Sequence, residues 1–440
     1  MADHAVSEDP AVQEQLDRLA SLSPGADVLG LDRITRLLEN LADPHLHLPP
    51  VFHVAGTNGK GSVCAFLRAA LQAEGKSVHV YTSPHLVRFN ERIRLNDVLI
   101  DDARLAGYLR RVLDAAGDIG PSFFEATTAA AFLAFVENPA DACIIEVGLG
   151  GRLDATNVIP APAVCGIAQL GIDHEAFLGS ELKQIAAEKA GIAKLGAPLV
   201  TMGYEPDIAA VIADRAVHAG ARWLAMGAAW DAVVYRERLH YRDERGRIDV
   251  PLPRLAGPHQ PMNLALAIAM LRHQTAVPVG EAALNAAPLW ATWPARLQQL
   301  HQGPLISKLG GEARAVWLDG GHNPAAGEAI AQYFTAERLA GNKLTLLIGM
   351  LANKDIAGFL APLRDRIGAI HSVPVEGHEH HPPEAFAALA SQWDITHQAH
   401  TDLGAAAGAI AQEGSSAPVL IAGSLYLAGE VLRLNDQFPD

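Results

Sequence analysis

The sequence predicts an α/β protein built on a doubly wound, mostly parallel sheet, and three observations lead to this prediction. Short runs that are apolar on both faces recur along the chain, as at Val51–Val54 and Ala142–Val147. Segments with apolar residues at helical spacing lie between these runs, as from Val63 to Leu71. The same alternation starts again after about residue 304. Strands that helices cover on both faces of a parallel sheet have this character.

The elements of the first part follow in order. After Val51–Val54 and besides 142–147, strands are expected at 77–81, 163–168 and 197–200. The helix that begins near Val63 should end at Gly75, because glycine commonly follows the last helical turn. A second amphipathic helix should begin after Asp102, a candidate N-cap residue.

The chain then changes character twice. Residues 230–250 alternate polar and apolar side chains around an Arg-Gly turn, which predicts a small antiparallel ribbon. A helix at about 261–272 follows, and the proline-rich and tryptophan-rich segment 287–304 is typical of a linker. Strands are then expected near 315–318, 344–348, 369–373 and 418–421. We therefore expect an N-terminal domain at residues 1–295, a linker at 296–304 and a smaller Rossmann-like domain at 305–440.

Composition excludes several classes of protein. The chain has 34 Lys and Arg residues against 49 Asp and Glu residues, a formal net charge of −15. No overall field therefore attracts nucleic acid or an anionic membrane surface, and an anionic ligand needs a local cluster of positive charge. The three cysteines lie in apolar stretches and are expected to be reduced core residues. The sequence has neither a signal-peptide core nor an apolar run of about 20 residues, so we expect a cytoplasmic protein without a membrane span. Separately, we expect a monomer.

The strongest local pattern is the glycine-rich segment at residues 54–62, VAGTNGKGS, between a buried strand and an amphipathic helix. In such a P-loop the backbone N–H groups turn toward phosphate oxygens, and the helix N-terminus adds positive potential. Lys60 would reach the β- and γ-phosphates, and Ser62 would offer its hydroxyl to magnesium. The segment departs from the strict Walker pattern, because Val54 replaces the first glycine and Gly61 follows the lysine. The alternative is a glycine-rich turn that binds nothing.

This variant of the loop resembles that of the Mur ligase superfamily, and specifically its folate branch, the bifunctional dihydrofolate synthases/folylpolyglutamate synthases. Other motifs of that branch follow in the expected order from about Leu29 to Glu430. They are TSPHL at 82–86, SFFE at 122–125, EVGLGGRLDATN at 146–157, DH at 173–174, EKAGI at 188–192, DGGHNP at 319–324, GMLANKD at 349–355 and GSLY at 423–426.

The resemblance implies an ATP site with two Mg²⁺ ions, for which Mn²⁺ is an alternative. The implied ATP-binding residues are Gly56, Thr57, Asn58, Gly59, Lys60, Gly61, Ser62, Asn263, Arg296 and Asp319. The implied metal ligands are Ser62, Ser83, Glu146 and His174. Glu146 also ends a buried strand, where ligands of open α/β sheets bind, whereas a lone histidine is more often structural.

The catalytic residues implied by the resemblance are Lys60, His174 and Lys189. Lys189 would be carbamylated on its side-chain nitrogen, giving an N6-carboxylysine. Without the resemblance, Lys189 would be predicted to be an ordinary surface lysine on an amphipathic helix.

The resemblance also implies sites for the pterin and for glutamate. The implied pterin-binding residues are Leu29, Gly30, Leu31, Asp32, Ser122, Phe123, Phe124, Glu125, Leu153, Asp154 and Ala155. Phe123 and Phe124 could stack on a flat ring, although their pattern alone predicts core residues. Lys354 and Ser424 are implied near the incoming glutamate, and His322 and Asn323 have no assigned role. The tract His378–His381 predicts either a solvated loop or a metal site.

The implied reaction is ATP-driven amide formation, with L-glutamate added to 7,8-dihydropteroate and to tetrahydrofolates and other reduced folates. Closure of the two domains would exclude water from an acyl phosphate. One alternative is a folylpolyglutamate synthase only. Another is a different Mur-type amide ligase, although a muramyl-peptide ligase needs a further domain before the P-loop, where this sequence has 55 residues. The remaining alternatives are a P-loop kinase or ATPase and a nucleotide-binding protein without catalysis.

Overall fold

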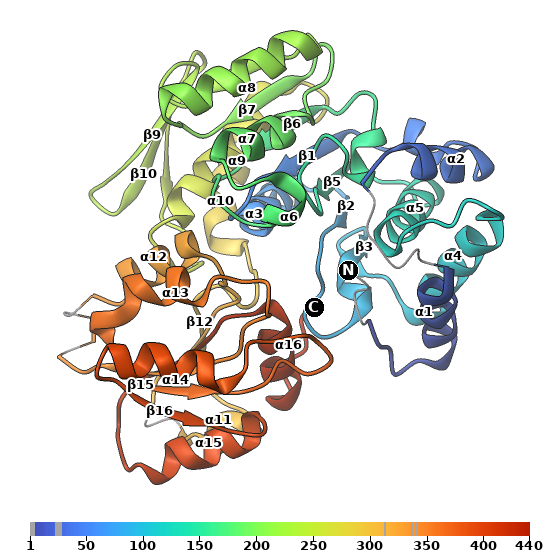
Figure 1. Ribbon diagram of the computed structural model, residues 1–440. Helices are drawn as coiled ribbons and strands as arrows, with labels where there is room; N and C mark the ends of the chain where they lie inside the picture. Colours follow the sequence, from blue (N-terminus) through green and yellow to red (C-terminus); the bar gives the residue numbers. More distant parts are fainter. Residues whose placement is uncertain (1–4, 23–28, 312–313, 336–337, 340) are drawn as a thin grey trace. The chain divides into compact units, whose positions relative to one another are not determined.

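The computed structural model describes residues 5–22, 29–311, 314–335, 338–339 and 341–440 (Figure 1). The chain divides into two compact units. Unit 1 comprises the chain up to Arg254, then Gln260–Thr292 and Asp440, and unit 2 comprises Leu255–His259 and Trp293–Pro439. The expected boundary lay at 296–304, a few residues later, and the return of 255–259 to unit 2 has no signal in the sequence pattern.

Unit 1 is built on an eight-stranded sheet with the order β4-β3-β2-β5-β1-β6-β7-β8. The strands are β1 (Val51–Ala55), β2 (Val78–Tyr81), β3 (Ile93–Leu95), β4 (Val98–Leu99), β5 (Ala142–Glu146), β6 (Val164–Ile167), β7 (Pro198–Thr201) and β8 (Arg222–Ala225). All neighbours pair in parallel except for β3, which is antiparallel to both β2 and β4. The chain passes from β5 on one side of β1 to β6 on the other. The predicted doubly wound sheet is confirmed, with its switch in strand order at β1.

Helices cover this sheet. They are α1 (Pro10–Leu22), α2 (Asp32–Asn40), η1 (Pro44–Leu46), α3 (Lys60–Ala73), η2 (Phe89–Arg92), α4 (Asp102–Ala115), α5 (Phe123–Glu137), η3 (Ala155–Val158), α6 (Glu175–Leu178), α7 (Leu182–Ala190), α8 (Pro206–Ala219), α9 (Gln260–His273) and α10 (Glu281–Trp290). Gly75 follows α3 with φ +76°, as predicted. The N-cap of α4 is Asp101 rather than the expected Asp102, because the Asp101 carboxylate accepts the Arg104 N–H at 2.8 Å.

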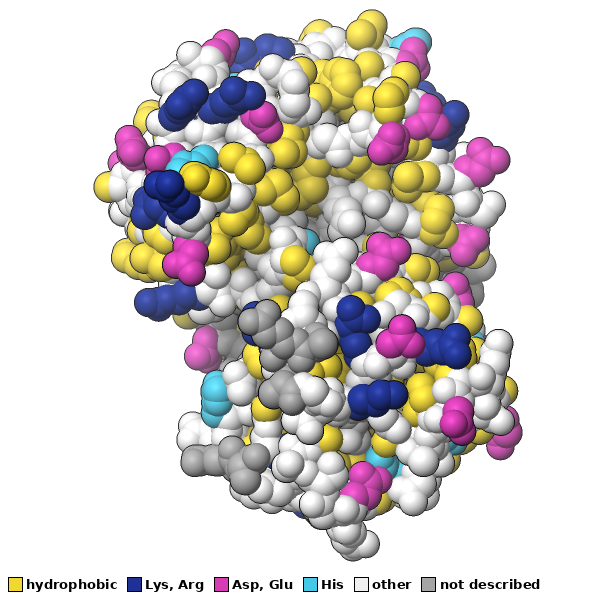
Figure 2. Space-filling view, turned by 90° about the vertical axis from the view of Figure 1, so that its left-hand side faces the viewer, with side chains coloured by type: hydrophobic (Ala, Val, Ile, Leu, Met, Phe, Trp, Pro, Cys, Tyr) yellow, Lys and Arg dark blue, Asp and Glu magenta, His cyan; other side chains and the backbone are white. Residues whose placement is uncertain are grey.

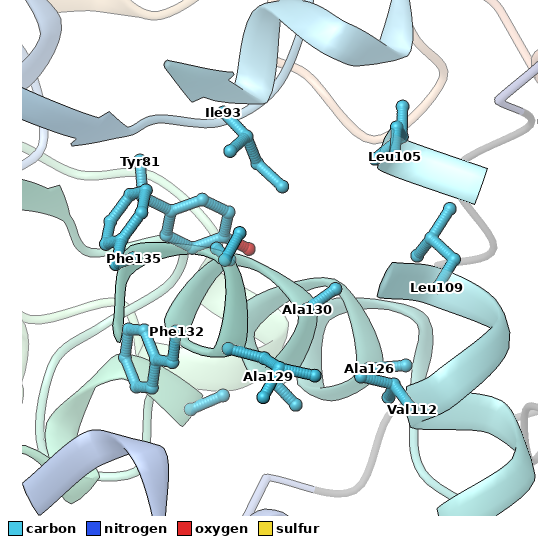
Figure 3. Close-up of a cluster of buried hydrophobic side chains, with 14 of the residues drawn as sticks. Tyr81, Ile93, Leu105, Leu109, Val112, Ala126, Ala129, Ala130, Phe132 and Phe135 are labelled. Atoms are coloured by element: carbon cyan, nitrogen blue, oxygen red, sulfur yellow. The ribbon is translucent and has the colours of Figure 1, made fainter. Parts of the chain in front are cut away.

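The core around α5 shows why that helix is alanine-rich. Nearly every side chain of α5 is buried, and the helix packs against α4. Figure 3 shows Ala126 of α5 beside Val112 of α4, with Tyr81 and Phe135 at the other end of the cluster. Small side chains let the two helix backbones approach closely, while the aromatic rings fill the wider space near the sheet.

The predicted ribbon is confirmed as a three-stranded antiparallel sheet of β9 (Trp230–Tyr235), β10 (Arg238–Asp243) and β11 (Gly246–Pro251). Asp243, at the end of β10, has a fully buried side chain. Its carboxylate accepts two hydrogen bonds of 2.6 Å from the guanidinium of Arg272 in α9. The pair holds α9 against the ribbon, and α9 in turn contacts α3 behind the P-loop.

Unit 2 has a six-stranded sheet with the order β12-β13-β17-β14-β15-β16, parallel except for β12. The strands are β12 (Gln298–Leu300), β13 (Val316–Leu318), β14 (Leu344–Ile348), β15 (Ile367–Ser372), β16 (Thr396–Ala399) and β17 (Val419–Ala422). The helices are α11 (Pro304–Lys308), α12 (Pro324–Tyr333), α13 (Ile356–Leu360), η5 (Ala361–Arg366), α14 (Pro383–Gln392), α15 (Leu403–Gln412) and α16 (Leu425–Leu434). The expected linker is therefore ordered: it contains β12, and α11 begins at its last residue.

The cysteines and the surface charges lie as the composition predicts. Cys64, Cys143 and Cys165 are buried and free, as predicted. No helix in the described ranges is both long and apolar enough to cross a bilayer. On the face drawn in Figure 2, Lys and Arg side chains are interspersed with Asp and Glu side chains.

Candidate active site

The P-loop follows β1 at the switch in strand order. Gly56 and Gly59 have φ values of +151° and +85°, and Gly59 is the N-cap of α3. A Cβ on Gly59 would lie 2.5 Å from Oδ1 of Asn263, and one on Gly56 would lie 2.8 Å from the Cβ of Ala168. Both positions therefore require glycine, for their conformation and for the space that their neighbours occupy.

The loop is fixed to the end of β6. The backbone N–H groups of Thr57 and Asn58 donate to the Gln169 carbonyl at 2.8 and 3.2 Å. The Thr57 hydroxyl donates to the Gly171 carbonyl at 3.0 Å and accepts from the Gly171 N–H at 3.1 Å. The Tyr204 hydroxyl lies 2.6 Å from the Ala168 carbonyl and steadies the same strand end. Gln169 and Tyr204 were missed in the sequence, because these contacts join segments far apart in the chain.

Two lysines meet at this loop. Lys60 Nζ lies 3.1 Å from the Gly56 carbonyl and 3.3 Å from the Thr57 carbonyl. Lys189 Nζ lies 3.0 Å from the same Gly56 carbonyl. Lys189 is only 4% exposed, so the alternative of an ordinary surface lysine is wrong. Burial, and then the positive charge of Lys60, lower the pKa of Lys189 to about 7.

The glycine-rich run after β5 explains how Lys189 reaches the loop. A Cβ on Gly151 would lie 2.6 Å from the Glu188 carbonyl and 2.9 Å from the Cα of Lys189. The Arg152 N–H donates to the Glu188 carbonyl at 2.8 Å, and the Arg152 guanidinium pairs with the Glu188 carboxylate at 2.9 Å. The last turn of α7 therefore packs directly on the backbone of this run.

Three of the four predicted metal ligands, all of them with side-chain oxygen atoms, lie at or after the ends of neighbouring strands of unit 1. Glu146 ends β5, is 5% exposed, and accepts the Ser83 N–H at 3.2 Å. The Ser62 hydroxyl, at the start of α3 after β1, is buried and has no hydrogen-bond partner among the residues that the structure describes. An orphaned buried hydroxyl beside a carboxylate-bearing strand end fits Mg²⁺ or Mn²⁺, which prefer oxygen ligands.

His174 differs from the other three predicted metal ligands. It is exposed and is the N-cap of α6 with φ +54°. Within the part of the chain that the structure describes, no three His, Cys, Asp or Glu side chains are grouped so as to hold a metal ion. The structure thus brings Ser83 into contact with Glu146, whereas a role for His174 stays a prediction.

In unit 2, Arg296 and Asp319 come together at the end of β13. The Asp319 carboxylate accepts the Leu297 N–H at 2.8 Å and the Gly321 N–H at 2.7 Å. Ala295 and Leu297, on either side of Arg296, have φ values of +54° and +44°. Left-handed conformations of non-glycine residues cost energy and are concentrated at functional sites.

His259 completes this group in unit 2. Burial lowers the pKa of His259, while Asp319 raises it and Arg296 lowers it further. Sequence reasoning missed this histidine, which directly precedes α9, because no local pattern distinguishes it. Asn263 is buried in unit 1, where its amide nitrogen donates to Gln260 at 3.1 Å.

Comparisons with known proteins agree with this geometry. A family described as the dihydrofolate synthetase C-terminal domain matches residues 304–434. The dihydrofolate synthase/folylpolyglutamate synthase of Escherichia coli is 33% identical over 93% of this chain and 92% of its own.

The chain belongs to the dihydrofolate synthase/folylpolyglutamate synthase family. The prediction drawn from the order of motifs is therefore confirmed. Among solved structures, that of E. coli FolC in complex with DHPP and ADP superposes with a TM-score of 0.85 and 32% identity, covering 98% of both chains. A bifunctional folylpolyglutamate synthase/dihydrofolate synthase with Mn, AMPPNP and L-glutamate bound gives a TM-score of 0.83 and 30% identity, covering 97% of this chain and 99% of that one.

The predicted pterin residues of this family member are partly structural. Ser122 and Glu125 form a capping box at the start of α5, and the Glu125 carboxylate also pairs with Arg33 at 2.9 Å. Phe123 lies in the core, edge-on to Phe89 at 5.7 Å. Phe124 is half-buried and covers Gly148, where a Cβ would lie 2.4 Å from its ring. Of the two rings, Phe124 is therefore the better candidate to stack on a pterin.

Asp154 is engaged within the protein. It is 3% exposed and accepts the N–H groups of Leu149 at 2.8 Å and Thr156 at 3.0 Å, together with the Thr156 hydroxyl. Burial raises the pKa of the Asp154 carboxyl. His53 of β1, which sequence reasoning missed, lies 2.9 Å from the Thr156 hydroxyl and extends the network. The flanking Leu153 and Ala155, and Leu29–Asp32 at the start of α2, keep their pterin role as a prediction.

The two predicted glutamate residues, Ser424 and Lys354, follow the carboxyl ends of neighbouring strands in unit 2. They come after β17 and β14, and Asp319 of the predicted ATP site follows the next strand, β13; all three strands are parallel. Ser424 is the N-cap of α16, where its hydroxyl accepts the Tyr426 N–H at 3.1 Å. Asn323 caps α12 in the same way, which explains its place in the motif.

Proposed function

We propose that this chain adds L-glutamate both to 7,8-dihydropteroate and to reduced folates, using ATP. The chain is a ligase of the folate family, and the predicted ATP-dependent acid–amino-acid ligation is confirmed at the level of that family. The observation that carries the proposal is the meeting of Lys60 and Lys189 at the Gly56 carbonyl, beside Glu146 and the orphaned Ser62 hydroxyl. A P-loop that only bound nucleotide would not need a second, buried lysine.

The proposed reaction has two steps. A carboxylate oxygen of the pteroate attacks the γ-phosphorus of ATP, the bond to the β-phosphate oxygen breaks, and ADP leaves. The amine nitrogen of glutamate then attacks the acyl carbon, phosphate leaves, and the nitrogen loses a proton. Lys60 would move from the loop carbonyls onto the phosphates and stabilise the charge that builds there. Divalent cations held by Ser62, Ser83 and Glu146 would supply further positive charge when bound.

Lys189 is proposed to carry a carbamate. With a pKa of about 7, a large fraction of Lys189 is the neutral amine near neutral pH. That amine adds to CO₂: a nitrogen–carbon bond forms, one proton is released, and an anion replaces the ammonium. The change replaces a buried positive charge, which Lys60 repels, with a negative charge that Lys60 and nearby cations attract. We also propose that the protein is cytoplasmic, where CO₂ and ATP are both present.

The experiment measures ADP release with dihydropteroate or tetrahydrofolate, each with and without L-glutamate. A bifunctional ligase releases ADP in a sustained reaction only when glutamate and either pterin substrate are present. If ADP is released with tetrahydrofolate and glutamate but not with dihydropteroate and glutamate, the protein is a folylpolyglutamate synthase only. Sustained release without glutamate or pterin would indicate an ATPase and contradict the proposal.

A further inference from the structure

The histidine-rich tract at 378–381 is fastened to the loop that carries Lys354. The Ala352 N–H donates to the Glu379 carbonyl at 3.0 Å, and the His381 N–H donates to the Met350 carbonyl at 2.9 Å. Leu351 and His380 form an antiparallel bridge between these contacts. The tract is a loop, as one of the two alternatives predicts, with Glu379 and His380 exposed, and this single bridge and its two flanking hydrogen bonds tie it to the loop after β14.

Side chains of the tract reach both predicted glutamate motifs. Nε2 of His381 lies 2.7 Å from the backbone carbonyl of Lys354. The ring of His378 stacks on the ring of Tyr426, with centroids 3.9 Å apart and planes at 28°. Tyr426 in turn donates its N–H to the Ser424 hydroxyl. One segment of four residues thus connects the loop of Lys354 with the turn of Ser424.

The substrate demands more donors than Lys354 supplies. L-glutamate carries two carboxylates, and a carboxylate accepts up to about four hydrogen bonds. Stacking on Tyr426 fixes the plane of the His378 ring, and both ring nitrogens lie in that plane rather than against the tyrosine. Glu376 and Glu430 also lie close to one another here: burial raises the pKa of Glu430, and the negative charge of Glu376 raises it further. These two carboxylates would attract the amino group of glutamate but repel its carboxylates. A glutamate carboxylate bound here therefore needs a hydrogen-bond donor to offset that repulsion.

We propose that His378 is a binding residue for L-glutamate and donates a ring N–H to one of its carboxylates. The inference rests on the proposed function, because it assigns a contact to the amino acid used by that reaction. The His378–Tyr426 stack sets the direction of this donor, and the His381 contact sets its place relative to Lys354.

The test compares steady-state kinetics of the wild-type chain with those of His378→Phe, which keeps a ring on Tyr426 and removes the N–H groups. We expect KM for L-glutamate to rise about 10- to 100-fold, which corresponds to the loss of a hydrogen bond to a charged group. KM for ATP and for dihydropteroate should stay within about 2-fold of wild type, since neither substrate meets His378. His378→Gln, which keeps an N–H donor, should recover part of the loss. His218→Phe, on an exposed histidine of α8, is the matched control and should change nothing.

The outcomes separate the two proposals. If the wild-type chain forms no ADP with dihydropteroate and glutamate, the proposed function fails before His378 is tested. If the wild type is active and His378→Phe leaves KM for glutamate unchanged, only the present inference is overturned. A parallel rise of all three KM values, or a loss of thermal stability in the variant, would make His378 a structural residue and would also overturn it.

Discussion

Replacing Lys189 with methionine should separate its chemical role from its cost to the fold. Lys189→Met keeps the length of the side chain and removes the ionisable amine. We expect the variant to be nearly inactive in ligation, because no carbamate can form. We also expect it to be more stable than the unmodified wild-type protein at pH 7.

The size of that stabilisation follows from the pKa. The amine has an ordinary value of 10.5 and a folded value of about 7. A difference of this size corresponds to at most roughly 5 kcal/mol, at 1.36 kcal/mol for each pKa unit. Relaxation around the lysine reduces this figure, so we expect a gain of about 2–4 kcal/mol. The folded state binds fewer protons than the unfolded state between pH 7 and pH 10.5, so wild-type stability should rise with pH across that window.

The assay is urea unfolding in CO₂-free buffer from pH 6 to pH 10.5, for the wild type and two variants. Lys189→Met should lack the rise in stability with pH that the wild type shows. Lys183→Met, on an exposed lysine of the same helix, should keep the rise. The reasoning is refuted if the wild type and Lys189→Met show the same dependence on pH.

The modification itself has a separate readout. Labelled ¹³C-bicarbonate should give a carbamate NMR signal in the wild type that Lys189→Met lacks. Acetate should restore some turnover to Lys189→Ala, where it can occupy the space of the carbamate. A fully active Lys189→Ala would contradict the proposed carbamate. It would leave the expected pH dependence of stability unchanged.

Three further predictions test other parts of the site. Lys60→Ala should abolish ADP release with either pterin substrate and change the melting temperature little, because the half-buried lysine gives up two hydrogen bonds to loop carbonyls and no core packing; wild-type turnover at saturating ATP would refute this. Gly59→Ala should raise KM for ATP at least about 10-fold through the clash with Asn263, whereas Gly75→Ala, at a similar φ but with open space, should cost only about 1 kcal/mol in urea unfolding. Asp154→Ala should cost about 1–3 kcal/mol in urea unfolding and raise KM for dihydropteroate more than KM for ATP; a rise confined to KM for ATP would move Asp154 to the nucleotide site.

Strands buried on both faces were the most predictable part of the fold. The apolar runs at β1, β5, β14 and β17 have every residue buried, so their sequence carries one unambiguous pattern. Strand β16 reads Thr-His-Gln-Ala at the sheet edge, where no buried face imposes a pattern. It was not predicted for that reason.

Long-range contacts limited the prediction of the site. The motifs named the P-loop and Glu146, because their residues are contiguous with a strand end. The burial of Lys189 depends instead on the backbone of Gly151 in another segment, and the bond from His53 to Thr156 spans 103 positions. The capping box of Ser122 and Glu125 was visible as a local pattern, but the same residues also fitted a ligand motif.

The passage of the chain between units has a practical consequence for dissecting this protein. Residues Leu255–His259 belong to unit 2, while the helix that starts at Gln260 belongs to unit 1. A C-terminal fragment that begins at Trp293 would therefore lack His259. The matching N-terminal fragment would carry Leu255–His259 without the rest of unit 2. Neither fragment is a complete unit, so ligand affinities measured on separately expressed halves would underestimate those of the intact chain. A cut before Leu255 would keep these five residues with unit 2 but would also remove α9 and α10 from unit 1, so the intact chain is the better starting point.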